Sequence, residues 1–227
     1  MVQTTQIAGR RTSVDVVFDH IYEEIASLRM LPGTRISEAE IAARFSVSRQ
    51  PVRDAFRRLQ NLDLLLIRPQ KATEVRRFSI KAIKKSRFVR ASVEAEVMRR
   101  AAVECDKAAG LLLDACLAQQ RKVVADCDFE AFGQLDYEFH KTLCEVAKVA
   151  FAFEVISSEK AKVDRLCLLG LAKEDRMPEL LADHEKIAEL VKQGDAEGAV
   201  AAGMEHLSRL DATIEAISIK NSDYFEP

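Results

Sequence analysis

Near the start of the chain, apolar residues recur three and four positions apart. This spacing places them on one face of a helix and predicts a helix over residues 14–28. Pro32 and Gly33 then end the pattern, because both residues favour turns over helix interiors. The apolar stripe consists of Val17, Phe18, Ile21, Ile25 and Leu28.

Two further helices are expected directly after this turn. Ser37 can cap a helix that ends near Phe45, and Glu40 three positions on would complete a capping box. After a short turn at residues 46–47, Ser48 is expected to cap a third helix, which has one apolar and one cationic face. The apolar face holds Val52, Ala55, Phe56 and Leu59, and the cationic face holds Arg49, Arg53 and Arg57.

Two short strands and a run of helices complete the pattern. Residues 64–68 and 73–77 have strand character around a turn, which predicts a wing. From Ser79 onward the apolar spacing is helical, with the short breaks typical of antiparallel bundles. The predicted fold is mainly α, with an N-terminal winged helix-turn-helix domain (1–78) and a C-terminal antiparallel six-helix bundle (79–227). The six helices are expected at 80–104, 107–126, 128–147, 149–171, 176–193 and 195–218.

Composition places the chain among ordinary globular proteins. Of its 227 residues, 48% are hydrophobic and 31% are charged, which favours buried cores over disorder. The longest charge-free apolar run, residues 166–172, is far shorter than the roughly 18 residues of a membrane span. We therefore expect no membrane partner and a cytoplasmic location. The five Cys lack a CxxC pair and are expected to be buried thiols.

The second and third predicted helices have the spacing of a helix-turn-helix, whose second helix enters the DNA major groove. Arg49 and Arg53 lie one turn apart, and a guanidinium there can bind guanine or a phosphate. Residues 1–78 hold 13 Lys and Arg against 9 Asp and Glu, whereas the remainder holds 21 against 27. A solvated amphipathic helix would show the same features. Candidate DNA contacts are Arg44, Arg49, Gln50, Arg53, Arg57, Arg58, Arg68 and Lys71.

Polar residues interrupt the apolar stripes of three bundle helices. Asp136 and His140 lie four positions apart on or beside one stripe, and His184 and His206 fall on the inward faces of the last two predicted helices. A buried carboxylate requires compensation, which a divalent metal would supply for all four side chains. Three nitrogens and one oxygen suit zinc, nickel or manganese. Each histidine alone is more simply a hydrogen-bonded core residue, but their joint placement favours the metal.

Two runs in the first domain are especially specific. They are residues 32–38, Pro-Gly-Thr-Arg-Ile-Ser-Glu, and residues 47–53, Val-Ser-Arg-Gln-Pro-Val-Arg. With them, residues 14–75 resemble the winged helix-turn-helix of the GntR family of bacterial transcription regulators. The resemblance implies operator binding through Ser48, Arg49, Gln50 and Arg53. Asp63 and Ala72 stand where the family usually has Gly; Asp tolerates the left-handed conformation, whereas Ala72 is expected to alter the wing.

The second domain carries its own family pattern. Its pieces are Arg-Ala-Ser-Val-Glu at 90–94, Asp-Tyr-Glu-Phe-His at 136–140, Asp-His-Glu at 183–185, Gly-Asp-Ala at 194–196 and Met-Glu-His-Leu at 204–207. Residues 79–217 thereby resemble the FCD-type ligand-binding domain, and six helices favour its VanR-like subgroup. The resemblance implies a metal bound by Asp136, His140, His184 and His206. Val149 stands where the family usually has Asn, so an effector contact by that Asn is not expected here.

In the FCD family a small carboxylate commonly meets the metal, which implies an organic acid as effector. A metal with open sites and a buried arginine together suit an anionic oxygen ligand. Arg90 is the first candidate for the partner of this acid and Arg165 the second, although either could pair with Glu94 or another acidic residue.

The expected function is that of a ligand-responsive transcription regulator. It would bind operator DNA as a homodimer, because two recognition helices one DNA turn apart read a palindrome. In a second interpretation the metal is purely structural or is itself the signal. A metal-dependent hydrolase is a third interpretation, since a bound metal can activate water. No obvious general base accompanies the ligands, so we do not expect an enzyme.

Overall fold

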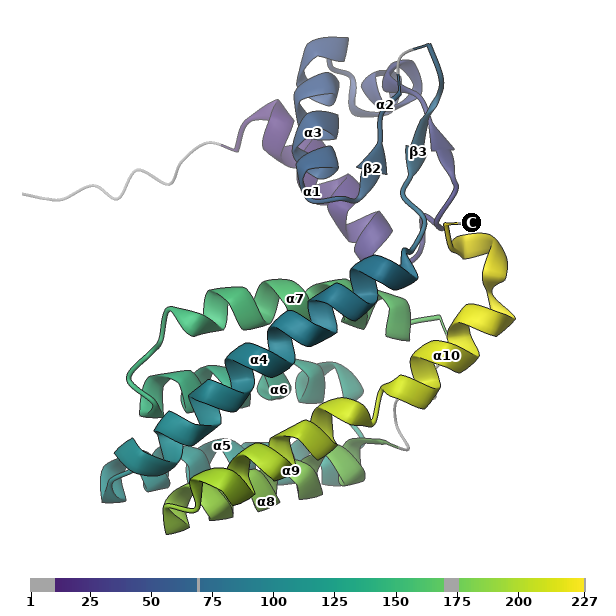
Figure 1. Ribbon diagram of the computed structural model, residues 1–227. Coiled ribbons are helices and arrows are strands. Elements are labelled where there is room, and N and C mark those ends of the chain that lie inside the picture. Colours follow the sequence, from purple (N-terminus) through teal and green to yellow (C-terminus); the bar gives the residue numbers. More distant parts are fainter. Residues whose placement is uncertain (1–10, 69, 170–175, 227) are drawn as a thin grey trace, which may run out of the picture. The chain divides into compact units, whose positions relative to one another are not determined.

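The computed structural model describes residues 11–68, 70–169 and 176–226 (Figure 1). It divides into two compact units. The first comprises the described residues up to Ser79 and those from Asp223 on, and the second spans Ile80–Ser222. Residues 223–226 fall within the second domain predicted from the sequence (79–227). They group with the first because the Phe225 ring packs 5.6 Å from that of Phe78, whose amide donates a 2.8 Å hydrogen bond to the Tyr224 carbonyl.

The first unit is a winged helix-turn-helix. The apolar stripes predicted from the sequence form its core, where Val17, Ile21, Val52 and Phe56 are fully buried. Two of its strands were predicted, and both are shorter than expected. A third strand, which the sequence analysis missed, pairs antiparallel with the last one and gives the sheet order β1-β3-β2. The elements are α1 (Ser13–Ala26), β1 (Arg35–Ile36), α2 (Glu38–Phe45), α3 (Arg49–Asn61), β2 (Leu65–Leu66) and β3 (Thr73–Val75).

The ends of α2 and α3 form the helix-turn-helix turn. The Ser37 hydroxyl accepts a hydrogen bond from the Ala39 amide and so caps α2, as expected, but among the described residues the capping box with Glu40 does not form. Ser46 ends α2 in the left-handed conformation at φ +54°, which turns the chain sharply toward α3. Ser48 occupies the N-cap position of α3, but its side chain makes no capping hydrogen bond. The prediction of a Ser48 side-chain cap is therefore wrong, and this hydroxyl is available for other contacts.

The second unit is a helical bundle in which α4 packs against α7 and α9, while α5 packs against α6 and α8 (Figure 1). The helix predicted at 195–218 is two helices separated at Arg209–Leu210. Within the described part of the chain the bundle therefore has seven α-helices instead of six, so the helix count does not support the VanR-like subgroup. The helices are α4 (Ile80–Glu104), α5 (Lys107–Ala125), α6 (Phe129–Val146), α7 (Ala152–Cys167), α8 (Met177–Gln193), α9 (Ala196–Ser208) and α10 (Asp211–Lys220), followed by a 3-10 turn, Ser222–Tyr224.

Two findings concern the expectations drawn from composition. None of the described helices is long and apolar enough to cross a membrane. Cys116, Cys144 and Cys167 are buried as expected, whereas Cys105 is half-buried and Cys127 is exposed, contrary to the expectation of burial. Cys127 lies in the turn between α5 and α6 with φ +53°, a position set by the turn and not by packing.

Candidate functional sites

A cluster of one carboxylate and three imidazoles lies inside the bundle. α6 supplies Asp136 and His140, α8 supplies His184 and α9 supplies His206, and all four side chains are buried. One ligand atom from each lies within 4.8 Å of the others. The four candidate metal ligands predicted from the sequence are thus brought together by three helices.

A polar side chain lies behind each imidazole, within 3.3 Å of its Nδ1 atom. His140 Nδ1 lies 2.9 Å from Glu94 Oε2 on α4, and His184 Nδ1 lies 2.8 Å from Gln120 Oε1 on α5. The amide nitrogen of Gln120 donates to the Leu135 carbonyl at 3.0 Å, so its oxygen faces His184 and must accept. His184 therefore carries its proton on Nδ1.

The third imidazole is held in the same way. His206 Nδ1 lies 3.3 Å from Asp183 Oδ2, and the Arg209 guanidinium binds both oxygens of that carboxylate at 2.6 and 2.8 Å. Nδ1 is therefore the donor in His206 as well. Such outer hydrogen bonds fix the ring orientation and leave Nε2 as the lone-pair nitrogen that a metal requires.

His184 Nε2 and Asp136 Oδ1 are close together without a hydrogen bond between them. His184 Nε2 lies 3.3 Å from Asp136 Oδ1, and it is buried without a well-directed hydrogen bond among the described residues. Burial lowers the pKa of His184 to about 4, so Nε2 is unprotonated at neutral pH. Two lone pairs thus face each other in a buried site, an arrangement that a cation between them would stabilise. The residues present therefore fit a divalent metal.

Lys160 on α7 is a functional candidate that the sequence analysis missed. Its buried ammonium lies 2.9 Å from Asp136 Oδ2 and 2.6 Å from Asp164 Oδ2, and 4.2 Å from the centre of the Tyr137 ring. Burial opposes ionisation of Asp136, but the adjacent Lys160 ammonium outweighs it and holds the carboxyl pKa well below its usual value. Asp136 is therefore an anion in the folded protein.

The two arginines predicted to bind an effector occupy different places. Arg90 is buried: its Nε lies 2.5 Å from Glu94 Oε1, and its Nη2 lies 3.1 Å from His140 Nε2. It pairs with Glu94, the alternative considered from the sequence, and also lines the cavity beside the cluster. Arg165 is not among the residues that line this cavity. Burial lowers its pKa to about 10.

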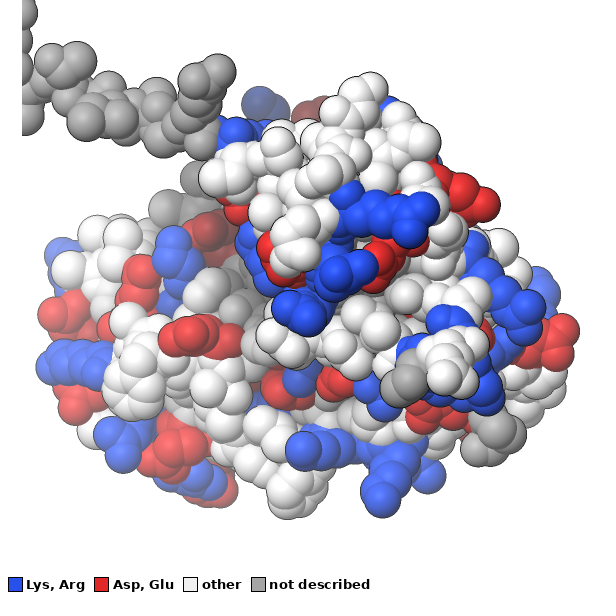
Figure 2. All heavy atoms as spheres, turned by 90° about the horizontal axis from the view of Figure 1, so that it is seen from above, with Lys and Arg blue, Asp and Glu red and all other residues white. Residues whose placement is uncertain are grey.

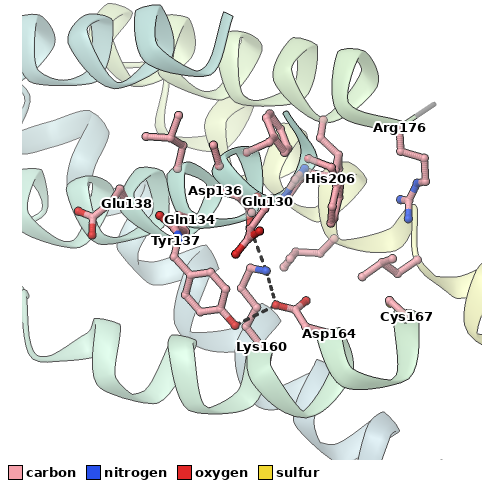
Figure 3. Close-up of a pocket in the computed structure, with 18 of the residues that line it drawn as sticks. Glu130, Gln134, Asp136, Tyr137, Glu138, Lys160, Asp164, Cys167, Arg176 and His206 are labelled. Atoms are coloured by element: carbon pink, nitrogen blue, oxygen red, sulfur yellow. Dashed lines mark hydrogen bonds and ion pairs between the residues drawn. The ribbon is translucent and has the colours of Figure 1, made fainter. Parts of the chain in front are cut away.

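The cavity has a volume of about 830 Å³ and lies against the cluster (Figure 3). In this view Lys160 lies between Asp136 and Asp164, and Arg176 lies beyond His206. The cavity thus combines a possible cation site with basic side chains and apolar walls. The walls include Phe129, Phe132, Leu180, Leu207 and Leu210.

The recognition helix α3 presents exposed polar side chains that are partly engaged with acidic neighbours. Arg53 binds Glu38 at 3.1 Å, and Gln50 Nε2 donates to Asp54 Oδ1 at 3.0 Å. Arg49 makes no side-chain hydrogen bond or ion pair with any described residue. Figure 2 shows the same mixing of basic and acidic side chains over the visible face. All the predicted contacts are exposed: Arg44, Ser48, Arg49, Gln50, Arg53, Arg57, Arg58, Arg68 and Lys71.

The first unit accommodates both replacements of glycine, Asp63 after the recognition helix and Ala72 in the wing turn. Asp63 adopts the left-handed conformation at φ +58° and binds Arg76 at 2.5 Å, in keeping with the tolerance expected of Asp. In the wing turn Gln70 takes positive φ, at +57°, and Ala72 does not. The left-handed position lies at Gln70, so Ala72 needs no unusual backbone conformation.

Four residues around the cluster were not named as site residues from the sequence. Gln120 and Lys160 occupy buried faces of their helices, and a polar residue among apolar neighbours at helical spacing is the signal that could have found them. Asp183 adjoins His184 in the chain but points to His206. Glu94 was considered only as a partner of Arg90. Their contacts cross between helices, which spacing along one helix does not predict.

Fold and site together define a class of protein: a winged helix-turn-helix DNA-binding unit joined to a helical domain with a buried His and Asp cluster. Residues 14–75 match the bacterial regulatory proteins of the gntR family, and residues 87–209 match the FCD domain. The chain belongs to the GntR family, with an FCD domain as its C-terminal part.

Curated relatives extend over nearly the whole chain. The HTH-type transcriptional repressor RspR of Escherichia coli is 31% identical over 99% of this chain and 99% of its own length. A probable D-xylose utilization operon transcriptional repressor of Paenarthrobacter nicotinovorans is 29% identical over 92% and 91%. The family and these relatives are transcriptional regulators, not enzymes, so the expectation that the chain is not an enzyme is confirmed.

Solved structures support the fold. E. coli McbR/YncC matches 91% of this chain and 99% of its own with a TM-score of 0.68 at 16% identity. A putative GntR transcriptional regulator from Rhodococcus matches 89% and 97%, also with a TM-score of 0.68, at 22% identity. The mainly α fold with a winged helix-turn-helix is therefore confirmed, and regulators of this family bind operator DNA.

Proposed function

We propose that the protein is a ligand-responsive transcriptional repressor that binds operator DNA as a homodimer. A divalent metal held by Asp136, His140, His184 and His206 would bind a small carboxylate effector. The main observation in support of the metal is that the lone pairs of His184 Nε2 and Asp136 Oδ1 face each other, 3.3 Å apart and buried. Zinc is the first choice for three nitrogens and one oxygen, with nickel and manganese as alternatives.

Carboxylate binding follows from the charges near the cluster. A metal supplies a positive charge that attracts one carboxylate oxygen, and Arg90 lies in hydrogen-bond distance of His140 Nε2. Once a metal holds His140 Nε2, the Nη2 group of Arg90 needs another acceptor. An effector carboxylate is a suitable one, because charged hydrogen bonds to a planar carboxylate are strong. Arg165, which is not in the cavity lining, is not retained in this proposal.

On the DNA side, α3 would enter the major groove. Ser48, Arg49, Gln50 and Arg53 would contact bases or nearby phosphates, and exposed Arg44, Arg57 and Lys71 would contact phosphates. Two copies are needed because one recognition helix offers little specificity. Effector binding would change operator affinity by a coupling free energy of roughly 1 to 3 kcal/mol.

Metal binding can be tested by native mass spectrometry of wild type and two matched variants. Asp136→Asn removes a proposed ligand, whereas Glu138→Gln neutralises an exposed carboxylate on the same helix. We expect wild type and Glu138→Gln to carry one metal per chain and Asp136→Asn to bind it at least about tenfold more weakly. Equal metal content in folded Asp136→Asn would contradict the site.

Coupling to DNA can be tested by fluorescence anisotropy with the upstream promoter region. Operator affinity would be measured for chelated and metal-reloaded protein, with and without a panel of organic acids. We expect an acid to change affinity only in the metal-loaded protein. A metal effect without any acid effect would favour a metal sensor, and no effect of either would favour a structural metal. Failure to bind any upstream DNA in a salt-sensitive manner would refute operator binding there.

A further inference from the structure

Arg176, at the start of α8, lies in the cavity away from the cluster. We propose that it forms a second anion-binding subsite, so that the effector is a dicarboxylate and not a monocarboxylate. This inference rests on the proposed function, because the first carboxylate is the one expected at the metal. In this inference Arg176 binds the second carboxylate of the effector, at the end away from the metal.

The observation behind the proposal is an unsatisfied donor. Arg176 lines the cavity, and its Nη2 is buried without a hydrogen-bond partner. No described carboxylate lies within ion-pair distance of its guanidinium. A buried cationic donor without an acceptor is unfavourable, and an anion in the cavity would remove that cost.

The other basic residues of the cavity wall are already paired. Arg90 binds Glu94, and Lys160 binds both Asp136 and Asp164. Among the described Lys and Arg side chains of the cavity wall, Arg176 is therefore the one whose charge is not matched by an adjacent acid. It is the best site for a second negative group.

The side chains that line the cavity indicate what kind of chain joins the two carboxylates of the effector. In Figure 3, Arg176 and Asp136 lie on opposite sides of His206, so one carboxylate at the cluster would not also satisfy Arg176. The cavity lining also includes Leu180, Leu207 and Leu210, which favour a hydrocarbon spacer. A volume of about 830 Å³ leaves room for a chain longer than that of a two- or three-carbon acid.

The test compares acids that differ only in their second carboxylate. Isothermal titration of metal-loaded protein would use unbranched dicarboxylates of four to seven carbons and the monocarboxylates of the same lengths, for example pentanedioate and pentanoate. Wild type would be compared with Arg176→Met, which removes the charge, and Arg176→Lys, which keeps it. Arg121→Met, a change at an exposed bundle residue outside the cavity lining, serves as the control.

We expect at least one dicarboxylate to bind wild type about tenfold or more tightly than its matched monocarboxylate, as a charged hydrogen bond allows. Arg176→Met should abolish this preference without changing monocarboxylate affinity, and Arg176→Lys should keep part of it. Metal-dependent binding of monocarboxylates with no dicarboxylate preference at any length would overturn this inference alone. If no acid binds the metal-loaded protein, the proposed effector site and this subsite both fail.

Discussion

Arg49 and Arg53, two proposed DNA contacts on α3, differ in the contacts that their side chains make within the protein. Arg53 must leave or share Glu38, whereas Arg49 has no side-chain partner among the described residues. We expect Arg49→Ala to weaken operator binding by about 10- to 100-fold, in line with the loss of one base or phosphate contact. Glu38→Gln should strengthen binding a few-fold, because an exposed ion pair contributes under about 1 kcal/mol and its acid repels phosphate. Anisotropy titration at fixed salt measures both.

Asp15 at the start of α1 gives the winged unit a measurable pH dependence. Hydrogen bonds from the Thr12 hydroxyl and the Arg58 guanidinium lower its pKa from 3.8 to about 2. Because the folded-state pKa is depressed, the stabilisation is complete above about pH 4 and is lost as pH falls toward 2. Carboxyl NMR titration should give this midpoint, and Arg58→Met should move it upward. An unchanged midpoint in that variant would exclude the Arg58 contribution.

Site residues could be predicted from the sequence where they lie on the same helix, because their spacing shows which face they share. Asp136 and His140 share a helix, and their spacing fixes their common face. The proton positions did not follow from the sequence, because His184 depends on Gln120 from α5 and His206 on Asp183 from α8. Lys160 was missed for the same reason, since its pairing with Asp136 connects α7 to α6.

At the scale of elements, Gly203 on α9 lies against the buried Met98 side chain of α4. A Cβ added at Gly203 would lie 2.1 Å from Met98 Sδ, whereas one added at Gly133 in α6 would meet nothing within 4 Å. We expect Gly203→Ala to lower the free energy of unfolding by about 1–3 kcal/mol through overpacking. Gly133→Ala should raise it by roughly 0.5–1 kcal/mol, since alanine favours helices. Urea unfolding of the pair measures both, and the same sign for both would contradict the packing argument.

Strand β1 and the break between α9 and α10 could not be predicted from the spacing of apolar residues. β1 is two residues long and is defined by its partner, since Arg35 pairs with Glu74 and Ile36 with Thr73. The break between α9 and α10 has neither glycine nor proline; it coincides with Arg209, whose side chain binds Asp183 on α8. Both features arise from tertiary contacts, which override local propensity.

At the scale of the whole molecule, the proposed dimer predicts the solution mass and the response to salt. Light scattering should give about twice the 25.4 kDa of one chain. The logarithm of operator affinity should fall linearly with that of salt, with a slope of about −0.9 for each phosphate contacted. Arg57→Ala should reduce this slope by about two units, one for each copy. A monomeric mass, or a change of only one unit, would argue against two copies on the operator.

The packing of Phe225 on Phe78 makes the winged unit discontinuous in sequence. Domains generally fold in the order in which they are synthesised, the N-terminal one first. Here the DNA-reading unit leaves the ribosome early but gains its last packing partner only after α4 to α10 have been translated. A nascent chain stalled within the bundle would therefore expose the Phe78 face, and the winged unit can be completed only in chains whose helical bundle has already been translated.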